Sequence, residues 1–329
     1  MRMQLSAIAA SQDGVFTRRQ ALHAGFTARE FATMTNRRGL WIRVRYGVYA
    51  DRARWQRLGE TGRAHLRDLG ALLVCADDAV LSHSSAARNQ ELPLVDVDDG
   101  LSHLTRAGTG QAARVEAGVK HHVAALNAEH VIRRDWIRLT EPIRTVMDLS
   151  RDYGYRCGLV SADAALRCGA DPDAMVALAQ GLTTEPRGPV FAAVAANADR
   201  RAQTPIETLG RILLNSMGIT ELVLQHRFFF DDGRHADGDI YAPELDHLFE
   251  CDGRLKYQDQ YDDSGRLVTG REVLWKEKVR EDTVRSQGTG VSRIIWADTI
   301  PQNAERARQR LWREIEQQQS ARRWMRRGA

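Results

Sequence analysis

Residues 235–252 read HADGDIYAPELDHLFECD, a stretch that predicts two successive β-strands. Asp239 lies near the end of the first strand, and Glu250 and Asp252 follow on the second. Because residues two apart on a strand point to the same face, the two later carboxylates share one side of the sheet. Carboxylates that meet at adjacent strand ends form a site of oxygen ligands, which Mg²⁺ and Mn²⁺ prefer. The stretch therefore predicts a metal site.

The chemistry that this site predicts is metal-dependent hydrolysis of a phosphodiester. A bound ion lowers the pKa of a water ligand and neutralises charge on a phosphate leaving group. Lys256 follows the turn at Gly253, and a lysine there can orient the water or stabilise the developing charge. Glu207, on the helix before the sheet, can add an outer ligand. We therefore assign catalytic roles to Asp239, Glu250, Asp252 and Lys256, and expect Mg²⁺ or Mn²⁺ to bind Asp239, Glu250 and Glu207.

The same spacing also has a plainer interpretation. Glu-x-Asp-Gly closes many hairpins, so Glu250 and Asp252 can equally belong to a solvated turn. The spacing by itself leaves both interpretations open.

The sequence around this stretch predicts a mixed sheet flanked by helices. The predicted order is one helix, three strands, a polar loop, a long helix and a final strand, followed by a charged helix from residue 301. The ranges are 205–217 for the first helix, 222–230, 235–241 and 245–251 for the strands, 262–270 for the loop, 271–287 for the long helix and 291–296 for the last strand.

The first 56 residues carry ten arginines against three acidic residues, a cluster typical of proteins with a polyanionic partner. Thr17 and Thr27 are predicted to cap two of three short helices, Thr27 together with Glu30 in a capping box. Residues 41–49 then alternate as strand, glycine turn and strand. Three helices and a hairpin are the order of a winged helix-turn-helix, which places one helix in the DNA major groove. The alternative is a set of solvated faces.

A winged helix would present its polar side chains to DNA in two ways. Arg29, Thr33 and Asn36 on the third helix are the candidate readers of base edges, and Arg43 and Arg45 on the hairpin would meet phosphates. The predicted DNA-binding residues are Arg18, Arg19, Arg29, Thr33, Asn36, Arg37, Arg38, Arg43 and Arg45.

The length of 329 residues suggests two or three domains. No apolar run is long enough to span a bilayer and no secretory signal is apparent, so we expect no membrane partner. The four cysteines form no Cys-x-x-Cys pair, which argues against a zinc site and fits a reduced, cytoplasmic setting.

The middle region, 57–203, predicts an α+β fold of unknown role. His83, at the start of a helix, is expected to be a packing or capping histidine rather than a catalyst. The region's predicted strands are 101–105, 119–124 and 136–139, and its later helices include 142–150 and 158–168.

Residues 204–298 resemble a widespread bacterial domain of unknown function that is related to very-short-patch-repair endonucleases and the PD-(D/E)xK nuclease superfamily. Residues 235–245, 249–257 and 276–282 carry the resemblance, with Thr204-Pro-Ile-Glu207 similar to the family's entry helix. The resemblance implies that Asp239 is the metal aspartate and Glu250 the second carboxylate. Asp252 stands where the motif lysine would be, so Lys256 would have to supply the positive charge.

The N-terminal region resembles the AbiEi-type antitoxin domain of type IV toxin–antitoxin systems, on the residues 13–21 and 41–49. Such domains are winged helices that bind promoter DNA. We therefore predict an α+β multi-domain protein: a winged helix-turn-helix over 1–56, an α+β middle region over 57–203, a restriction-endonuclease-like mixed α/β sheet over 204–298 and a basic C-terminal helix over 299–329.

Two functions follow from these expectations. The first is a cytoplasmic DNA-binding protein with an endonuclease-like, Mg²⁺-dependent C-terminal domain. The alternative is a non-catalytic, antitoxin-like transcriptional regulator, with DNA and a cognate toxin as its partners.

Overall fold

The computed structural model of the chain describes residues 2–75, 78–98, 100–108, 113–230, 233–253, 260–261, 267–268 and 283–328, with the backbone alone for 260–261, 267–268 and 322–328. Within these residues helices combine with four β-sheets, so the predicted α+β class is confirmed. The chain divides into two compact units, Met1–Ala198 and Asp199–Ala329.

The N-terminal part of the first unit consists of helices around a small antiparallel sheet with the strand order β1-β3-β2. Thr17 and Thr27 cap their helices as predicted, since each hydroxyl accepts the backbone N–H three residues on, at 3.1 and 3.2 Å. The predicted hairpin over 41–49 is also present. The elements are α1 (Met3–Ser11), β1 (Val15–Thr17), α2 (Arg18–His23), α3 (Ala28–Thr35), β2 (Trp41–Arg45), β3 (Val48–Asp51) and α4 (Arg52–Arg57).

An aromatic cluster holds this part together. Trp41 is 2% exposed, and its ring lies edge-on to Phe16 and Phe26, with ring centroids 4.9 Å away in both cases. Phe31 of α3 lies 5.7 Å from the same ring. Edge-to-face aromatic packing adds to the free energy of burial, so Trp41 fixes α3 against the sheet.

Helix α5 (Glu60–Val74) joins this small sheet to the middle region. Its buried Leu66 and Leu69 belong to one apolar core with Val15 and Val48 of the first sheet and with Leu81 of the next. The chain on either side of residues 56 and 57 therefore shares a single core.

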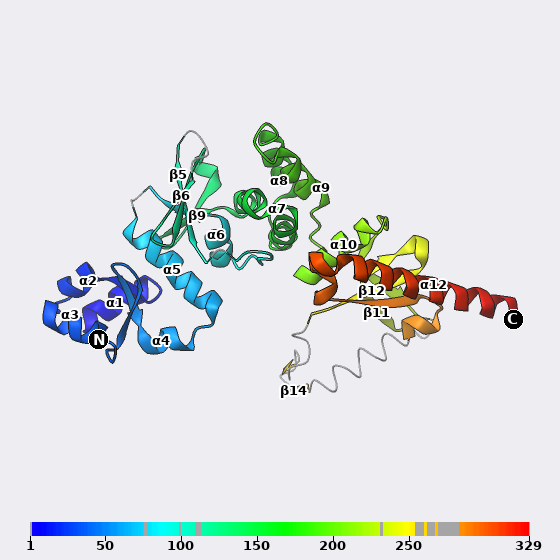
Figure 1. The fold of residues 1–329 in the computed structure, drawn as a ribbon, viewed down its shortest axis with the longest axis horizontal. Helices are drawn as coiled ribbons and strands as arrows, with labels where there is room; N and C mark the ends of the chain where they lie inside the picture. Colours follow the sequence, from blue (N-terminus) through cyan, green and yellow to red (C-terminus); the bar gives the residue numbers. More distant parts are fainter. Residues whose placement is uncertain are drawn as a thin grey trace. The chain divides into compact units, whose positions relative to one another are not determined.

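The middle region contains a six-stranded mixed sheet with the order β6-β7-β5-β4-β9-β8 (Figure 1). The strands expected near 101–105, 119–124 and 136–139 are present as β5, β7 and β9, whereas β4, β6 and β8 were not expected. The elements are β4 (Val80–Leu81), α6 (His83–Asn89), β5 (Ser102–Ala107), β6 (Ala113–Glu116), β7 (Val119–Ala124), η1 (Ala128–His130), β8 (Val131–Arg134) and β9 (Ile137–Thr140).

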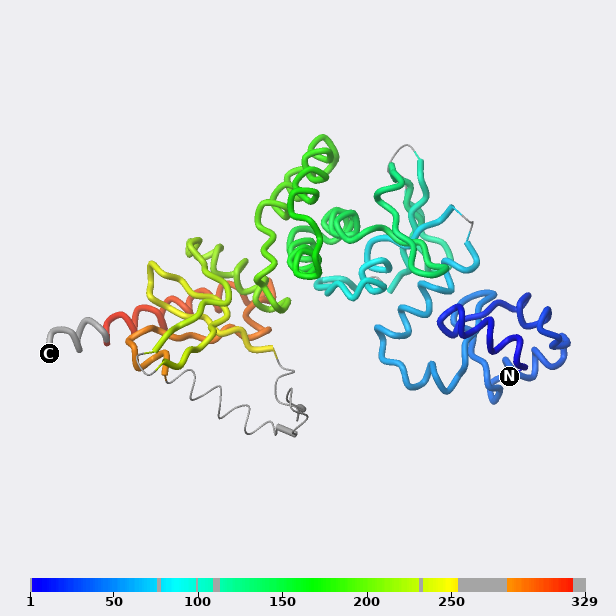
Figure 2. Tube along the Cα trace, turned by 180° about the vertical axis from the view of Figure 1, so that it is seen from behind, coloured from blue at the N-terminus to red at the C-terminus, as the bar shows by residue number. Residues whose placement is uncertain are grey.

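Helix α7 (Pro142–Arg167) covers the two helical segments predicted at 142–150 and 158–168, and it breaks at Gly154, where φ is 84°. Positive φ is accessible to glycine because it lacks a Cβ atom. The break changes the direction of the helix directly after Asp152 and Tyr153. Helices α8 (Pro172–Gly181) and α9 (Gly188–Asn197) complete the unit beside α7, as the tube in Figure 2 shows.

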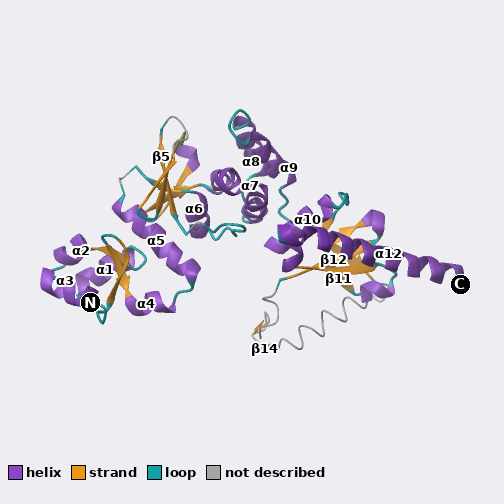
Figure 3. Ribbon diagram, in the orientation of Figure 1, coloured by secondary structure: helices purple, strands orange, loops and turns teal. Residues whose placement is uncertain are grey.

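The second unit is built on a four-stranded sheet with the order β10-β11-β12-β15, in which β12 and β15 are parallel and the other pairs antiparallel. Ile240, Phe249 and Ile294 pack on one face against Ile206 of α10 and Leu311 of α12, the two helices drawn over the sheet in Figure 3. The elements are α10 (Pro205–Ser216), β10 (Val223–Phe229), β11 (His235–Ala242), η2 (Pro243–Leu245), β12 (His247–Asp252), β13 (Gln260–Tyr261), β14 (Leu267–Val268), β15 (Gly290–Ile295), η3 (Trp296–Thr299), η4 (Pro301–Asn303) and α12 (Ala304–Gly328).

Some residues and elements predicted for the second unit lie outside the part of the chain that the structure describes. Lys256, most of the polar loop at 262–270 and most of the long helix at 271–287 lie outside the described residues. Among the helices that are described, none combines the length and the apolar character needed to cross a membrane.

Candidate functional site

Glu207 lies in the first turn of α10 and is 3% exposed. Its Oε2 atom accepts the backbone N–H of Gln203 at 2.8 Å and the side-chain amide of Gln225 at 2.9 Å, while Oε1 accepts the Thr204 hydroxyl at 2.7 Å. Burial raises the pKa of this carboxyl, and the negative charge of Asp239 adds to the rise, against the lowering effect of the three hydrogen bonds. Glu207 is therefore an acidic group whose orientation is fixed by hydrogen bonds and which interacts electrostatically with Asp239.

Asp239 lies within β11 and is half-buried. Its Oδ2 atom accepts the backbone N–H of Cys251 on β12 at 2.7 Å. Across β10, the pairs Leu224↔Ile240 and His226↔Gly238 place Gln225 opposite Asp239. Gln225 has a φ of 51°, a conformation that costs a non-glycine residue of order 1–3 kcal/mol and that tends to occur at functional sites. The strained residue is the one whose side chain holds Glu207.

Glu250 is 8% exposed and lies on β12, where its register partner on the parallel strand β15 is Arg293. Asp252, at the end of the same strand, forms a salt bridge with Arg293 at 3.3 Å. The position where the resemblance expects the motif lysine is therefore one half of an ion pair.

The predicted ligands are all carboxylates, and an all-oxygen donor set suits Mg²⁺ or Mn²⁺. Asp239 and Glu250 lie on neighbouring strands, and the negative charge of Asp239 helps to raise the pKa of Glu207. Within the described part of the chain these three side chains do not form a set with all ligand atoms within 4.8 Å of one another. The metal site stays a prediction, as does the role of Lys256.

The predicted DNA-binding surface is mostly open to solvent. Eight of the nine residues are exposed. Arg45 is the exception: it is half-buried, and its side chain lies against Gly70 of α5. Burial lowers the pKa of the Arg45 guanidinium. The hairpin therefore presents Arg43 but turns Arg45 towards the protein.

Six arginines on α2, α3, β2 and the loop that follows α3 are exposed, and within residues 2–75 none of them forms a salt bridge. Arg18 lies over the Phe31 ring at 5.7 Å, which leaves its charge available on the surface. Unpaired cations keep their full attraction for a polyanion, so this set is a candidate contact surface for phosphates. The six are Arg18, Arg19, Arg29, Arg37, Arg38 and Arg43.

A second cluster of candidate ligands, in the middle region of the first unit, was not predicted from the sequence. Among the described residues, His83, His103 and His122 form the set of histidine, cysteine and acidic side chains whose ligand atoms all lie within 4.8 Å of one another. We expected His83 to be a packing or capping residue, and its partners could not be identified because they lie far away in the sequence. Paired cysteines are a common sequence signal of a zinc site, and they give no information about histidines that lie on a helix and two separate strands.

Comparison with protein-family models gives no match, and none of the curated proteins matches the chain. Among solved structures the chain is similar to the RV2827C protein of Mycobacterium tuberculosis, with 14% sequence identity and a TM-score of 0.36. The alignment covers 62% of this chain and 78% of that one. A likeness at this level carries no argument about fold family or function.

Proposed function

We propose that the protein binds DNA in the cytoplasm through its N-terminal part and hydrolyses phosphodiester bonds with a divalent ion in its C-terminal unit. The observation that carries the proposal is the set of acidic groups on α10, β11 and β12. Glu207 is buried and held by three hydrogen bonds, and its pKa is raised in part by Asp239. Glu250 is buried on the strand next to Asp239.

The order of elements supports an endonuclease-like fold for this unit. A helix, three antiparallel strands and a further strand parallel to the third agree with the resemblance to PD-(D/E)xK nucleases. Asp239 and Glu250 occupy the positions that the resemblance gives to the two metal carboxylates.

Each residue has a distinct part in the proposed reaction. A bound Mg²⁺ or Mn²⁺ supplies an activated water and neutralises charge on phosphate. Asp239 and Glu250 would hold the ion, and the Cys251 N–H donates to the Asp239 carboxylate at 2.7 Å and so fixes its position. Glu207, whose oxygens already accept three hydrogen bonds, acts as an outer group that orients water. Lys256 and Asp252 complete the predicted catalytic set.

The winged helix-turn-helix interpretation is supported by the N-terminal elements. Helices α2 and α3 are followed by the β2–β3 hairpin, and β1 adds to the same sheet. Arg29, Thr33 and Asn36 are exposed on α3 or directly after it, where a recognition helix would meet base edges. Arg43 is exposed on the hairpin, where it can reach a phosphate.

A specific observation favours the alternative, a non-catalytic antitoxin-like regulator with a toxin partner. Asp252 stands at the position of the motif lysine and is paired with Arg293 at 3.3 Å. A carboxylate paired with arginine at this position does not supply the positive charge that the motif lysine gives to a nuclease.

The test is nicking of supercoiled plasmid by the purified full chain with Mg²⁺ or Mn²⁺. The test variant is Asp239→Asn with Glu250→Gln, and the matched control is Glu221→Gln with Glu244→Gln, two exposed carboxylates of the same unit. We expect metal-dependent nicking by the wild type and the control, and loss of nicking in the test variant. Equal nicking by test and control variants would refute the assignment of the site. Absence of metal-dependent nicking by the wild type would favour the regulator.

A further inference from the structure

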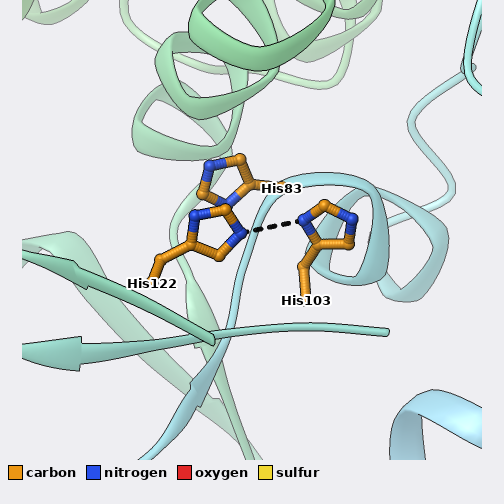
Figure 4. A group of neighbouring side chains, drawn as sticks. All are labelled: His83, His103 and His122. Carbon is orange, nitrogen blue, oxygen red and sulfur yellow. Dashed lines mark hydrogen bonds between the residues drawn. The ribbon is translucent and has the colours of Figure 1, made fainter. Parts of the chain in front are cut away.

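Three neighbouring strands of the six-stranded sheet bring His83, His103 and His122 together (Figure 4). His103 lies on β5 and His122 on the parallel strand β7, with Thr105 as the register partner of His122. His83 begins α6 directly after β4, the other neighbour of β5. Because alternate residues of a strand share a face, His103 and Thr105 lie on the same side of the sheet as His122.

The cluster lies inside the protein and its rings are close. His83, His103 and His122 are 2%, 0% and 9% exposed. The Nδ1 atom of His103 lies 3.0 Å from Nε2 of His122, and the His83 ring stacks on the His122 ring with centroids 3.8 Å apart. Three buried imidazoles in mutual contact are unusual for an apolar core, since each brings polar atoms that must be satisfied away from water.

Groups around the cluster fix the orientation of the rings. The Tyr153 hydroxyl lies 3.1 Å from Nε2 of His103, on the opposite side of that ring from His122. The Ser82 hydroxyl lies 2.9 Å from Nδ1 of His83 and accepts a hydrogen bond from Thr105. Histidines that bind metals typically donate their second ring N–H to a carboxylate, a carbonyl or a water oxygen, and here hydroxyl oxygens lie at that place.

A carboxylate lies at the edge of the cluster. The Oδ2 atom of Asp152 is 3.8 Å from Nε2 of His83 and 2.6 Å from Nζ of Lys120. Asp152 and Tyr153 directly precede the break of α7 at Gly154, so the break sets the place of both side chains. A negative group this close can partly balance the charge of a buried cation.

His83 adopts a strained backbone conformation, with a φ of 47°. This region is uncommon outside glycine, although asparagine, aspartate and histidine adopt it more often than other residues, and it costs of order 1–3 kcal/mol. Such strain persists only where the surrounding structure imposes it. Here the strained residue is one that points its ring into the cluster.

We propose that His83, His103 and His122 bind a divalent transition-metal ion of the borderline class, Zn²⁺ above all. Neutral imidazole suits Zn²⁺ and its neighbours in the transition series, whereas Mg²⁺ and Ca²⁺ require oxygen ligands. Three histidines leave one position of a tetrahedral ion for a further ligand, and their nitrogen donors distinguish this site from the carboxylate site of the other unit.

The experiment measures metal bound to the full chain. The protein is stripped with a chelator, dialysed against Zn²⁺ or Co²⁺ and analysed for metal content and for the intense visible absorption of four-coordinate Co²⁺. The test variants are His103→Gln and His122→Gln. The matched control is His121→Gln, because His121 is the strand neighbour of His122 and points to the other face of the sheet. Circular dichroism verifies the fold of each variant.

We expect about one Zn²⁺ per chain in the wild type and in His121→Gln, and its loss in both test variants. If a test variant does not fold, Tyr153→Phe replaces it, because removing an outer hydrogen bond to a ligand lowers metal affinity about 10–100-fold. The carboxylate variant Asp239→Asn with Glu250→Gln should keep its Zn²⁺, which separates this site from the proposed nuclease site. Absence of retained metal in the wild type, or equal Zn²⁺ in wild type and test variants, would overturn the proposal.

Discussion

The exposed arginines of the N-terminal part predict how steeply DNA binding falls with salt. Of the six unpaired arginines, Arg29 is a candidate base reader, which leaves five for phosphates: Arg18, Arg19, Arg37, Arg38 and Arg43. Each phosphate contact contributes about −0.9 to the slope of log K against log salt concentration, so the expected slope is about −4.5. Between 50 and 200 mM salt, affinity should therefore fall about 500-fold.

Replacing Arg37, Arg38 and Arg43 by glutamine removes three of these contacts. The slope should drop to about −1.8, and the loss of affinity over the same salt range to about 12-fold. Fluorescence anisotropy of a labelled duplex, titrated with the full chain at several salt concentrations, measures both values.

The control for this experiment carries the same change of charge elsewhere. Arg133, Arg187 and Arg200 are exposed arginines beyond the N-terminal part, and their triple glutamine variant should keep the wild-type slope. Equal slopes in the wild type and the Arg37, Arg38, Arg43 variant would refute the phosphate-contact surface. A slope reduced equally in both variants would show that only total charge matters.

Two further predictions concern stability. Trp41→Ala should lower the free energy of unfolding by about 3–5 kcal/mol, because it leaves a cavity in the aromatic cluster with Phe16, Phe26 and Phe31. The control Leu40→Ala, at an exposed position, should change the free energy of unfolding by less than about 0.5 kcal/mol. Guanidinium unfolding followed by far-UV circular dichroism measures both values, and similar losses in the two variants would contradict the prediction. Burial and the negative charge of Asp239 raise the pKa of the Glu207 carboxyl above its ordinary value of 4.5. The folded protein therefore binds this proton more tightly than the unfolded chain does. As a result, the wild type loses stability as the pH rises from 4.5 through the raised pKa. Glu207→Gln has no carboxyl to ionise, so its free energy of unfolding should rise relative to that of the wild type as the pH increases over this range. Unfolding curves of both proteins at several pH values measure this difference. A difference in the free energy of unfolding that does not change with pH would exclude the raised pKa.

Local sequence signals predicted local structure well. The caps at Thr17 and Thr27 depend on groups three residues apart, and both form as expected. The hairpin over 41–49 needs only an alternating pattern and Gly47, whose φ is 79°. Strand β4 is two residues long and β8 only four, and such short strands leave little pattern to detect.

The candidate sites depend on contacts between segments that are far apart in the sequence. Spacing placed Glu250 and Asp252 on one strand, but the partner of Asp252 is Arg293, which comes from a parallel strand beyond a long connection. The histidine cluster was harder still to predict. His83, His103 and His122 lie 20 and 19 residues apart, too far for spacing along the chain to indicate a contact, and only the order of strands β7, β5 and β4 makes them neighbours.

The strand order of the middle sheet also has a consequence for how the chain reaches its native state. Strand β4 pairs in parallel with β9, although β5, β6, β7 and β8 all lie between them in the sequence. The antiparallel pairs β6–β7 and β8–β9 are local and quick to close, whereas the β4–β9 pair must bring distant segments together at a larger cost in chain entropy. A ribosome releases the histidine-bearing strands before β9, so for a time the nascent half-sheet has an open edge along β4, the kind of edge at which chains associate wrongly. Closure of that edge by β9 is therefore the step that we expect to set the pace of folding for this unit.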